Sequence, residues 1–595
     1  MSNKHLINSV NDCVRESMYG FAKLNKNISV DFDNNIVLNM NVEKNMNKIC
    51  LISGGGSGHE PFPAGYVGTG MLTASISGSI FASPPSLNIL KAIRWASKRF
   101  DEILLIVPNY TGDVLNFGLA VENANYYGIP VKSFVVGEDV AQEVFGVKNK
   151  TGKRGTCGLI FIIKIAGYMI EKEYEMNSII KHLNEILNSM ATMGLCLSSC
   201  SKPGTGILFH LDENELELGV GVHGEKGVKR LKRLTAKEGV EEILKRLIDY
   251  LNLKDGDEVI VMINNLGSVT HLEIWLLVGE VEKQLERLRI KIIKIYSGFF
   301  FTSLNMNGFQ ICLLKMDEKY KNLCLDALNH PTNASAWSNN IIIDSKIVED
   351  VEDVEELEDE DINRFDDSIR VLSKETVEIL KECFIDISNE LIKEENYLNQ
   401  LDGYCGDGDC GSTFKSLASG ILEKIMKNEL NFSNPENLFT QLSLIVQKNV
   451  GGTTGALYGL FFKGISQELK EQQMEDYENL SIVVAKAWRR GIETIKRYST
   501  ARIGDKTMLD GLETACEKFE KEVKKPFCNM MKAFEGATLA SENACERTKQ
   551  LSATAGRASY IDPLKQNTID PGTYAVKIWM MAILNVLKKK IFPTE

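Results

Sequence analysis

The chain has 595 residues, of which 44% are hydrophobic and 25% are charged, and a formal net charge of −12. A single hydrophobic core rarely grows beyond ~250–300 residues, so this length predicts at least two domains. Residues 349–361 hold ten acidic residues and no basic ones, and the charges of the remaining chain almost balance. This distribution excludes a broad basic surface for nucleic acid.

The cysteines and the apolar segments indicate a cytoplasmic protein. The thirteen cysteines are scattered and lack the paired C-x-x-C arrangement of a zinc site, which is typical of reduced thiols. The start has no basic region followed by an apolar core, so we expect no signal peptide. The most apolar stretch, residues 158–170, contains Lys164 and is shorter than the ~18 residues that indicate a membrane span. We therefore expect no membrane insertion.

The first part of the chain has the pattern of an α/β domain. Between about residues 20 and 340, apolar runs such as 102–108 and 257–263 end in loops rich in glycine or asparagine, and helical patterns such as 86–100 separate them. Continuous apolar runs of this length predict buried strands. Ligands of such folds gather at the loops beyond the strand ends.

The pattern changes after the acidic run. Within residues 373–391 apolar side chains recur at spacings of three and four, and Ser373 stands where a helix cap is expected. These features predict an amphipathic helix, and similar patterns continue to the end of the chain. The sequence thus predicts an α/β domain over 1–343, an acidic linker over 344–369, and an all-helical domain over 370–595.

Three glycine-rich loops of the first domain contain candidate catalytic residues. His59 lies in "SGGGSGHEP", Asp113 in "NYTGDVLNFG" and His223 in "ELGVGVHGE". Glycines let a ligand approach the backbone closely, and the spacing fits neither a dinucleotide fingerprint nor a Walker loop. A neutral imidazole can add to a ketone carbonyl, and a carboxylate can accept a hydroxyl proton. The alternative is a set of tight turns between strands and helices.

The second domain has a cluster of acidic residues. The segment "LDGYCGDGDCGST" places Asp402, Asp407 and Asp409 within eight residues, and such carboxylates suit Mg²⁺ that shares its coordination with phosphate. An EF-hand is excluded because, counted from Asp407, positions five and twelve have no side-chain oxygen. A solvated turn remains the alternative.

Four further segments of this domain contain glycine, and most of them precede helical patterns. The segments are 450–459, 501–512, 555–561 and 570–576. Helix N-termini placed in this way can bind phosphate groups.

The motifs of the first domain closely resemble the K domain of the dihydroxyacetone (glycerone) kinases. "ISGGGSGHEP", "NYTGDVLNFG", "ELGVGVHGE", "INNLGS" and "SGFFFTSLNMNGF" follow one another in the order of that family. The resemblance implies two α/β subdomains, with dihydroxyacetone held as a hemiaminal on His223, His59 aiding its orientation and Asp113 acting as the base. The implied substrate-binding positions are Gly56, Ser57, Gly58, His59 and Asp113.

The second domain resembles the L domain of the same kinases, a helical barrel that binds ATP with two Mg²⁺ ions. The resemblance implies that Asp402, Asp407 and Asp409 are the metal ligands. The implied nucleotide contacts are Asp407, Gly408, Asp409, Cys410, Thr453, Thr454, Ser499, Thr507, Met508, Arg557, Asp570, Pro571 and Gly572. The fusion of both domains resembles the single-chain, ATP-using enzymes of the triokinase/FMN cyclase type. It implies a homodimer in which the nucleotide domain of one subunit serves the substrate site of the other.

One residue departs from the family pattern. The family usually reads K-N-Y-T-G-D, and this chain has Pro108 in place of the lysine. Proline offers neither an amine nor a backbone N–H. A ketone-binding regulator that no longer transfers phosphate therefore stays open as an alternative. The resemblance leaves two further alternatives, because some relatives also phosphorylate glyceraldehyde or cleave FAD to cyclic FMN with Mn²⁺. The complete set of aspartates speaks against the regulator.

Overall fold

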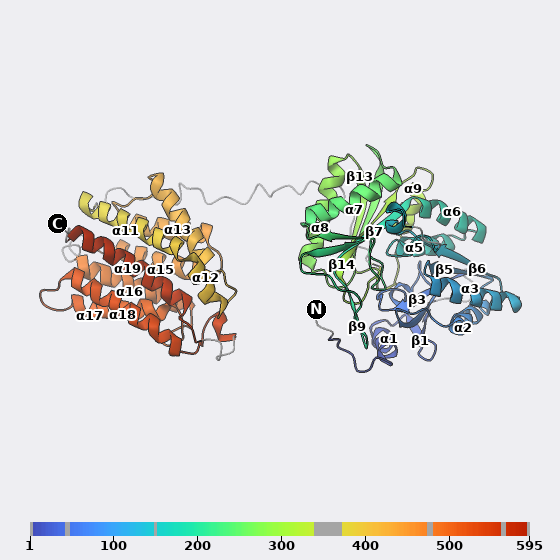
Figure 1. Cartoon of the computed structure of the whole chain (residues 1–595), viewed down its shortest axis with the longest axis horizontal. Coiled ribbons are helices and arrows are strands. Elements are labelled where there is room, and N and C mark those ends of the chain that lie inside the picture. The colour runs from blue at the N-terminus through green and yellow to red at the C-terminus, as the bar shows by residue number, and fades with distance from the viewer. Residues whose placement is uncertain are drawn as a thin grey trace. The chain divides into compact units, whose positions relative to one another are not determined.

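The chain divides into two compact units, Met1–Glu349 and Asp350–Glu595 (Figure 1). The structure is a computed structural model that describes residues 4–41, 48–147, 151–337, 372–472, 480–560 and 567–591. The predicted acidic linker, 344–369, lies outside the described residues, so the expected domain boundaries stay a prediction.

The first unit contains a six-stranded sheet that carries the first glycine-rich loops. Its order is β1-β2-β4-β3-β5-β6, and β4, β3, β5 and β6 run parallel. All nine residues of β3 are buried, as expected for a central strand with helices on both faces. The strands are β1 (Ile28–Asp31), β2 (Ile36–Asn39), β3 (Ile49–Ser57), β4 (Ala74–Ile80), β5 (Glu102–Pro108) and β6 (Val131–Val136).

A second six-stranded sheet forms the other half of this unit, so the first domain has the expected two α/β parts. Its order is β11-β10-β7-β14-β12-β13, and apart from the parallel pair β12–β13 its neighbours run antiparallel. The strands are β7 (Met190–Ser198), β10 (Glu215–Leu218), β11 (Lys229–Lys232), β12 (Glu258–Asn265), β13 (Lys291–Gly298) and β14 (Asn307–Lys315).

Helices cover both sheets, and one of them lies between the two. Helices α2 (Ser86–Ser97) and α3 (Thr111–Tyr126) pack on one face of the first sheet, and α7 (Ala236–Leu251) and α8 (His271–Arg287) on one face of the second. Helix α5 (Leu159–Glu171) shares one core with inward-facing residues of both sheets. This placement explains why residues 158–170 are apolar except for Lys164, because nearly the whole helix is buried in the core.

The second unit is the expected helical barrel. Each of eight described helices packs against the next, and α11 closes the ring by packing against both α13 and α19. The helices are α11 (Lys374–Lys393), α13 (Cys410–Met426), α14 (Pro435–Asn449), α15 (Gly452–Glu471), α16 (Leu480–Tyr498), α17 (Met508–Val523), α18 (Met530–Arg547) and α19 (Pro571–Ile591). The side chain of Ser373 caps α11 by accepting the N–H of Thr376 at 3.2 Å, as its position predicts.

The barrel encloses an apolar cavity of about 550 Å³. The apolar face predicted for α11 contributes Leu380, Phe384 and Ile387 to its wall, together with Trp488 and Trp579 of the facing helices. Both tryptophans pack against each other with ring centroids 6.4 Å apart, so they belong to the interior of the barrel, as expected.

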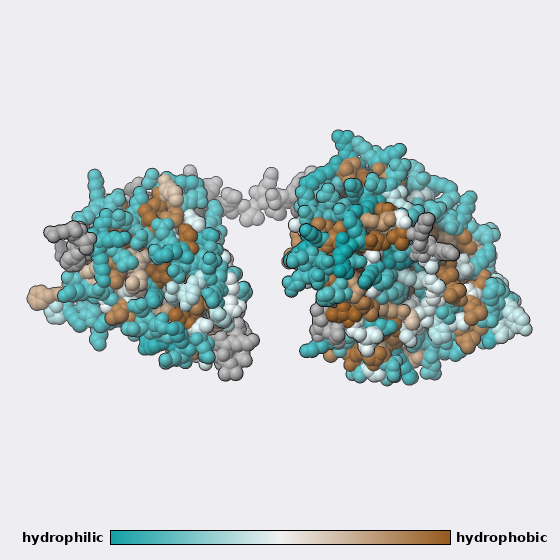
Figure 2. All heavy atoms as spheres, viewed as in Figure 1, coloured by the Kyte–Doolittle hydropathy of each residue, from teal (hydrophilic) through white to brown (hydrophobic). Residues whose placement is uncertain are grey.

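One face of the molecule shows hydrophilic and apolar regions side by side (Figure 2). Figure 2 shows both units covered largely by hydrophilic side chains that apolar patches interrupt. In the described part of the chain no helix combines the length and the hydropathy that a membrane crossing needs. All thirteen cysteines are free thiols, and ten of them are buried, in agreement with the prediction of reduced cysteines.

Candidate active site

Two histidines that are 164 positions apart in the chain meet in the first unit. His59 follows β3, and His223 lies in the loop between β10 and β11. Their Nε2 atoms are 3.1 Å apart, and the ring planes are perpendicular, with centroids separated by 4.7 Å. The glycine-rich loops of the two sheets therefore converge at one point, as the sequence predicted for a small polar substrate.

The hydrogen bonds around His59 determine the tautomers of both rings. Nδ1 of His59 lies 2.8 Å from the carbonyl oxygen of Thr302, and a carbonyl only accepts, so Nδ1 carries the hydrogen. In the neutral ring Nε2 then has the lone pair, and it accepts the Nε2–H of His223. The pair is thus arranged to pass a proton from His223 to His59.

Both rings are neutral at physiological pH. Burial lowers the pKa of His59 to about 3, and the charge of His223 lowers it as well. Burial also lowers the pKa of His223 to about 4, assisted by the positive charges of Arg154 and Lys202. A neutral imidazole retains the lone pair that a nucleophile or a base needs.

Asp113 lies in the first turn of α3, which follows β5. Because β5 runs parallel to β3, Asp113 lies at the same end of the first sheet as His59. Its side chain is buried, and burial raises its pKa to about 7, although a hydrogen bond from Ser83 partly offsets this effect. A carboxyl group with a pKa near neutrality is suited to accept and return a proton.

The segment after β4 joins these groups. The ring of Phe81 stacks on His59 with centroids 5.2 Å apart, and Ser83 donates its hydroxyl hydrogen to Asp113. Phe81 has a left-handed φ of 59°, which is uncommon for a bulky residue. Neither residue could be predicted from the sequence, because no motif marks a short turn between a strand and a helix.

The glycines of the first loop make this packing fit. A Cβ atom at Gly56 would lie 2.9 Å from the backbone nitrogen of Ala82, and one at Gly58 would lie 2.9 Å from the ring of Phe81. Gly58 also has a φ of 96°, which favours glycine. The predicted contact Ser57 uses its hydroxyl inside the sheet, where it donates to the carbonyl of Gly78 at 2.7 Å.

An ionic network that is buried at Asp139 and Arg154 and partly exposed at Glu225 holds the loop of His223. Glu225 accepts the backbone N–H of His223 at 2.8 Å, and its other oxygen lies 3.2 Å from Arg154. Arg154 also pairs with Asp139 at 2.5 Å and donates to the carbonyl of Gly219 at 2.7 Å. These residues escaped the sequence analysis, since only the tertiary structure brings them to the loop.

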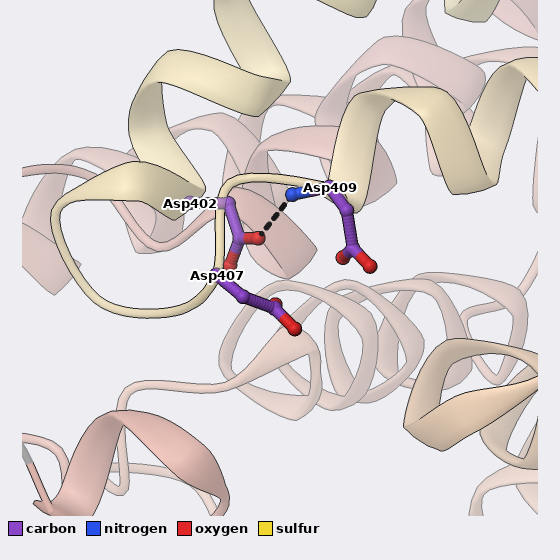
Figure 3. Close-up of side chains that lie close together, drawn as sticks. All are labelled: Asp402, Asp407 and Asp409. Carbon is purple, nitrogen blue, oxygen red and sulfur yellow. Dashed lines mark hydrogen bonds between the residues drawn. The ribbon is translucent and has the colours of Figure 1, made fainter. Parts of the chain in front are cut away.

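The acidic cluster of the second unit has the geometry of a cation site. One ligand oxygen from each of Asp402, Asp407 and Asp409 lies within 4.8 Å of the others (Figure 3). Asp402 also accepts the backbone N–H groups of Gly408, Asp409 and Cys410 at 2.9 to 3.3 Å. The loop is therefore held by Asp402, while the carboxylates of Asp407 and Asp409 are exposed. This donor set suits Mg²⁺.

An open hollow of about 270 Å³ adjoins this cluster. Its walls come from Asp409 and the first turns of α13, and from the end of α14 with Gly451 before α15. The predicted contacts Thr453 and Thr454 lie in the first turn of α15. Ser416 and Asn449 also line the hollow, and no sequence pattern pointed to them.

The remaining predicted contacts lie at the starts of two other helices. Thr507 caps α17, and Met508 follows it. Pro571 and Gly572 begin α19, and Thr573 donates its hydroxyl hydrogen to the carbonyl of Thr507 at 2.6 Å. The two helix starts are thus adjacent, which places two positive dipole ends together.

Asp570 connects this region with the acidic loop. Burial raises the pKa of Asp570 to about 6, and its charge, like that of Asp402, acts on the Cys410 thiol. Ser499 follows α16 and accepts the N–H of Ala501 at 3.1 Å. Arg557 begins a short 3-10 helix, and its side chain lies outside the described residues.

Comparison with known proteins identifies the family. Residues 19–335 match the Dak1 domain, and residues 404–585 match the DAK2 domain. Triokinase/FMN cyclase of Homo sapiens is 37% identical over 596 residues, which cover 99% of this chain and 100% of that protein. This chain belongs to the dihydroxyacetone kinase family. Dihydroxyacetone kinase 1 of Saccharomyces cerevisiae is 32% identical over 97% of the chain and 99% of its own length.

Solved structures of the family have the same fold. Crystal structures of the dihydroxyacetone kinase of C. freundii, in the native form and in complex with AMP-PNP and Mg²⁺, match with a TM-score of 0.66 and 28% identity. They cover 98% of this chain and 100% of the matched chain. A dihydroxyacetone kinase operon co-activator, DhaQ, matches 54% of this chain with a TM-score of 0.51 and 29% identity.

The acidic cluster predicts that cation binding weakens when one of its carboxylate charges is removed. The substitution Asp407→Asn should lower the affinity for Mn²⁺ in the presence of AMP-PNP at least about tenfold. Mutation of a residue that only hydrogen-bonds to a metal ligand already lowers metal affinity about tenfold. Titration calorimetry with the full chain measures this. Glu423→Gln, which removes one exposed charge from α13, is the matched control and should bind like the wild type. Equal affinities of the wild type and the Asp407 variant would contradict the assignment.

Proposed function

We propose that this protein transfers the γ-phosphoryl group of ATP to dihydroxyacetone. The observation that carries the proposal is the direct contact between His59, which is buried, and His223, which is partly buried, two histidines from different sheets. The segment with Phe81 and Ser83 links this pair to Asp113, whose pKa burial raises to about 7. The second unit adds a cation and phosphate site on the same chain, and the similarity to the kinases extends over both units.

Capture of the ketone uses the histidine pair. A ring nitrogen of His223 adds to the carbonyl carbon, and the electron pair of the C=O π bond moves to the oxygen. The hydrogen on Nε2 of His223 passes to the lone pair on Nε2 of His59, which returns it to the ketone oxygen. One N–C bond and one O–H bond form in exchange for the π bond and the N–H bond, and the hemiaminal is neutral.

Phosphoryl transfer uses Asp113 and the nucleotide. Asp113 accepts the proton of the terminal hydroxyl group as its oxygen attacks the γ-phosphorus, and the bond between that phosphorus and the ADP oxygen breaks. Asp402, Asp407 and Asp409 would hold two Mg²⁺ ions, which neutralise the charge of the phosphates. The N-termini of α13, α15, α17 and α19 would favour the negative charge of the nucleotide through the positive ends of their dipoles.

The covalent capture explains which substrates are accepted. Glycerol has no carbonyl group and cannot add to His223, whereas glyceraldehyde can. Glyceraldehyde is therefore a second candidate substrate. Cleavage of FAD to cyclic FMN, with Mn²⁺ in the acidic cluster, is a second candidate reaction, favoured by the 37% identity to a triokinase/FMN cyclase.

The regulator remains the alternative without catalysis. The operon co-activator with the related fold matches only 54% of this chain, and this chain adds a complete barrel with the acidic cluster. A sensor of the ketone has no need of a nucleotide site, so the barrel favours the enzyme. We assign the protein to the cytoplasm, where ATP and small carbonyl substrates are available.

His223 provides the first test. The full chain should release ADP from MgATP when dihydroxyacetone is added and not when glycerol is added. His223→Ala should abolish the release, because no hemiaminal forms, while any cleavage of FAD persists. His210→Ala, an exposed histidine of the same unit, should behave like the wild type. Phosphorylation of dihydroxyacetone by the His223 variant at the wild-type rate would overturn the covalent mechanism.

The pKa of Asp113 predicts the pH dependence. The base works only when ionised, and burial raises its pKa to about 7, so kcat/KM should fall tenfold per pH unit below pH 7 and level off above it. Both histidines stay neutral over this range. Initial rates between pH 5.5 and 8.5 measure the profile. A constant kcat/KM between pH 6 and pH 8 would exclude Asp113 as the base.

A homodimer with sites shared between subunits is the proposed assembly. At a cation concentration too low to saturate Asp407→Asn, mixing this variant with His223→Ala, after dissociation and reassembly, should give more activity than either variant alone. Each hybrid then has one intact substrate site and one intact nucleotide site, on different chains. Wild-type protein treated in the same way is the control. A mixture that is no more active than either variant while this control recovers, or a monomeric mass in solution, would exclude the shared arrangement.

A further inference from the structure

Position 108 leaves the acceptor side of the site without the cation that the family pattern has there. Pro108 ends β5 and is buried. Its ring lies 3.7 Å from the point where a Cβ atom of Gly55 would stand, and an oxygen of Asp113 lies 4.0 Å from the same point. Pro108 and Asp113 thus both lie close to Gly55, and the family lysine, which would add a positive charge to this neighbourhood, is absent.

Two cations act on His223 from other directions. The charges of Arg154 and Lys202 both reach its ring. Arg154 is committed, because Asp139 and Glu225 both pair with its guanidinium group. In the part of the chain that the structure describes, no carboxylate pairs with Lys202 in the way that these two pair with Arg154. Lys202 is therefore the cation that remains available to a ligand on His223.

A small hairpin determines where Lys202 lies. Strands β8 (Ser201–Lys202) and β9 (Gly206–Ile207) pair antiparallel, with Lys202 opposite Gly206. The pairing continues towards β7 through the N–H of Leu208, which donates to the carbonyl of Cys200 at 3.3 Å. Lys202 is half-buried.

One face of this hairpin packs on the loop of His223. A Cβ atom at Gly224 would lie 2.3 Å from Leu208 and 2.8 Å from the sulfur of Cys200. Side chains alternate along paired strands, so Lys202 lies on the same face as Cys200. The opposite face carries Ser201, which contacts Asn305 and His5. The face of the hairpin to which Lys202 belongs is therefore the one that packs on the loop of His223.

We infer that Lys202 is a substrate-positioning residue of this enzyme, whose ammonium group donates to the oxygen of the ketone captured on His223. The inference rests on the proposed function and deepens it. As the nitrogen adds to the carbonyl carbon, negative charge develops on the oxygen, and a cation on that side stabilises it until His59 returns the proton. Lys202 thereby supplies a positive charge at the carbonyl end of the substrate, whereas the family lysine that Pro108 replaces would supply one near the hydroxyl group.

The test separates ketone binding from phosphoryl transfer. Titration calorimetry of the full chain with dihydroxyacetone, without nucleotide, should give a Kd for Lys202→Met at least about tenfold above that of the wild type, the size of a lost charge-assisted hydrogen bond. Lys202→Arg retains the charge and should remain within about threefold, by the same reasoning. Native mass spectrometry should show less of the adduct, whose mass exceeds the protein by one intact ketone because addition expels no water.

Matched controls distinguish a role of Lys202 in positioning the ketone from a purely structural role. Lys229→Met removes an exposed lysine of the neighbouring strand β11 and should bind dihydroxyacetone like the wild type. The thermal midpoint and the affinity for AMP-PNP with Mg²⁺ should be equal in all four proteins. Wild-type affinity in Lys202→Met, an equal loss in Lys229→Met, or loss of both ligands together with stability would overturn the inference. Wild-type protein that binds the ketone without turnover would overturn only the proposed kinase activity.

Discussion

The connection between residues 58–60 and 302–304 is the constraint on which the site depends. The carbonyl of Gly58 accepts the N–H of Leu304 at 2.8 Å, and Nδ1 of His59 donates to the carbonyl of Thr302 at 2.8 Å. These bonds join the loop after β3, in the first sheet, to the segment between β13 and β14, in the second sheet. They hold the first sheet's histidine against the second sheet's histidine, and they fix the tautomer that makes His59 an acceptor.

Burial gives the site its reactivity and requires compensation nearby. Two imidazoles lose most of their hydration, so each remains neutral and nucleophilic, and Asp113 gains a pKa near 7 from the same cause. A buried carboxylate such as Asp139 would be costly without its partner, and Arg154 provides that partner at 2.5 Å. The ionic network therefore stabilises the loop of His223 without placing an unbalanced charge on the ring.

Features that depend on residues close together in the chain could be predicted better than features that depend on tertiary contacts. The buried strands, the helix after Ser373 and the cluster of Asp402, Asp407 and Asp409 could be predicted, because each depends on residues close together in the chain. The family motifs extended this to His59, Asp113 and His223, although neither their tautomers nor their contacts follow from spacing. Lys202 escaped prediction, since only the packing of the hairpin on Gly224 brings its face of the hairpin to the loop of His223.

In the proposed function, the two units recognise their ligands by different kinds of interaction. A three-carbon ketone offers few contacts, and the first unit can select it through a bond that only a carbonyl group forms, which needs small neighbours such as Gly56 and Gly58 rather than a large enclosing surface. A nucleotide offers several negative charges, and the second unit meets them with helix N-termini and a carboxylate cluster that holds cations. Because the ketone site and the nucleotide site share no residue, substitutions in the first unit can change the preference for the carbonyl substrate while the phosphate site of the second unit stays unchanged.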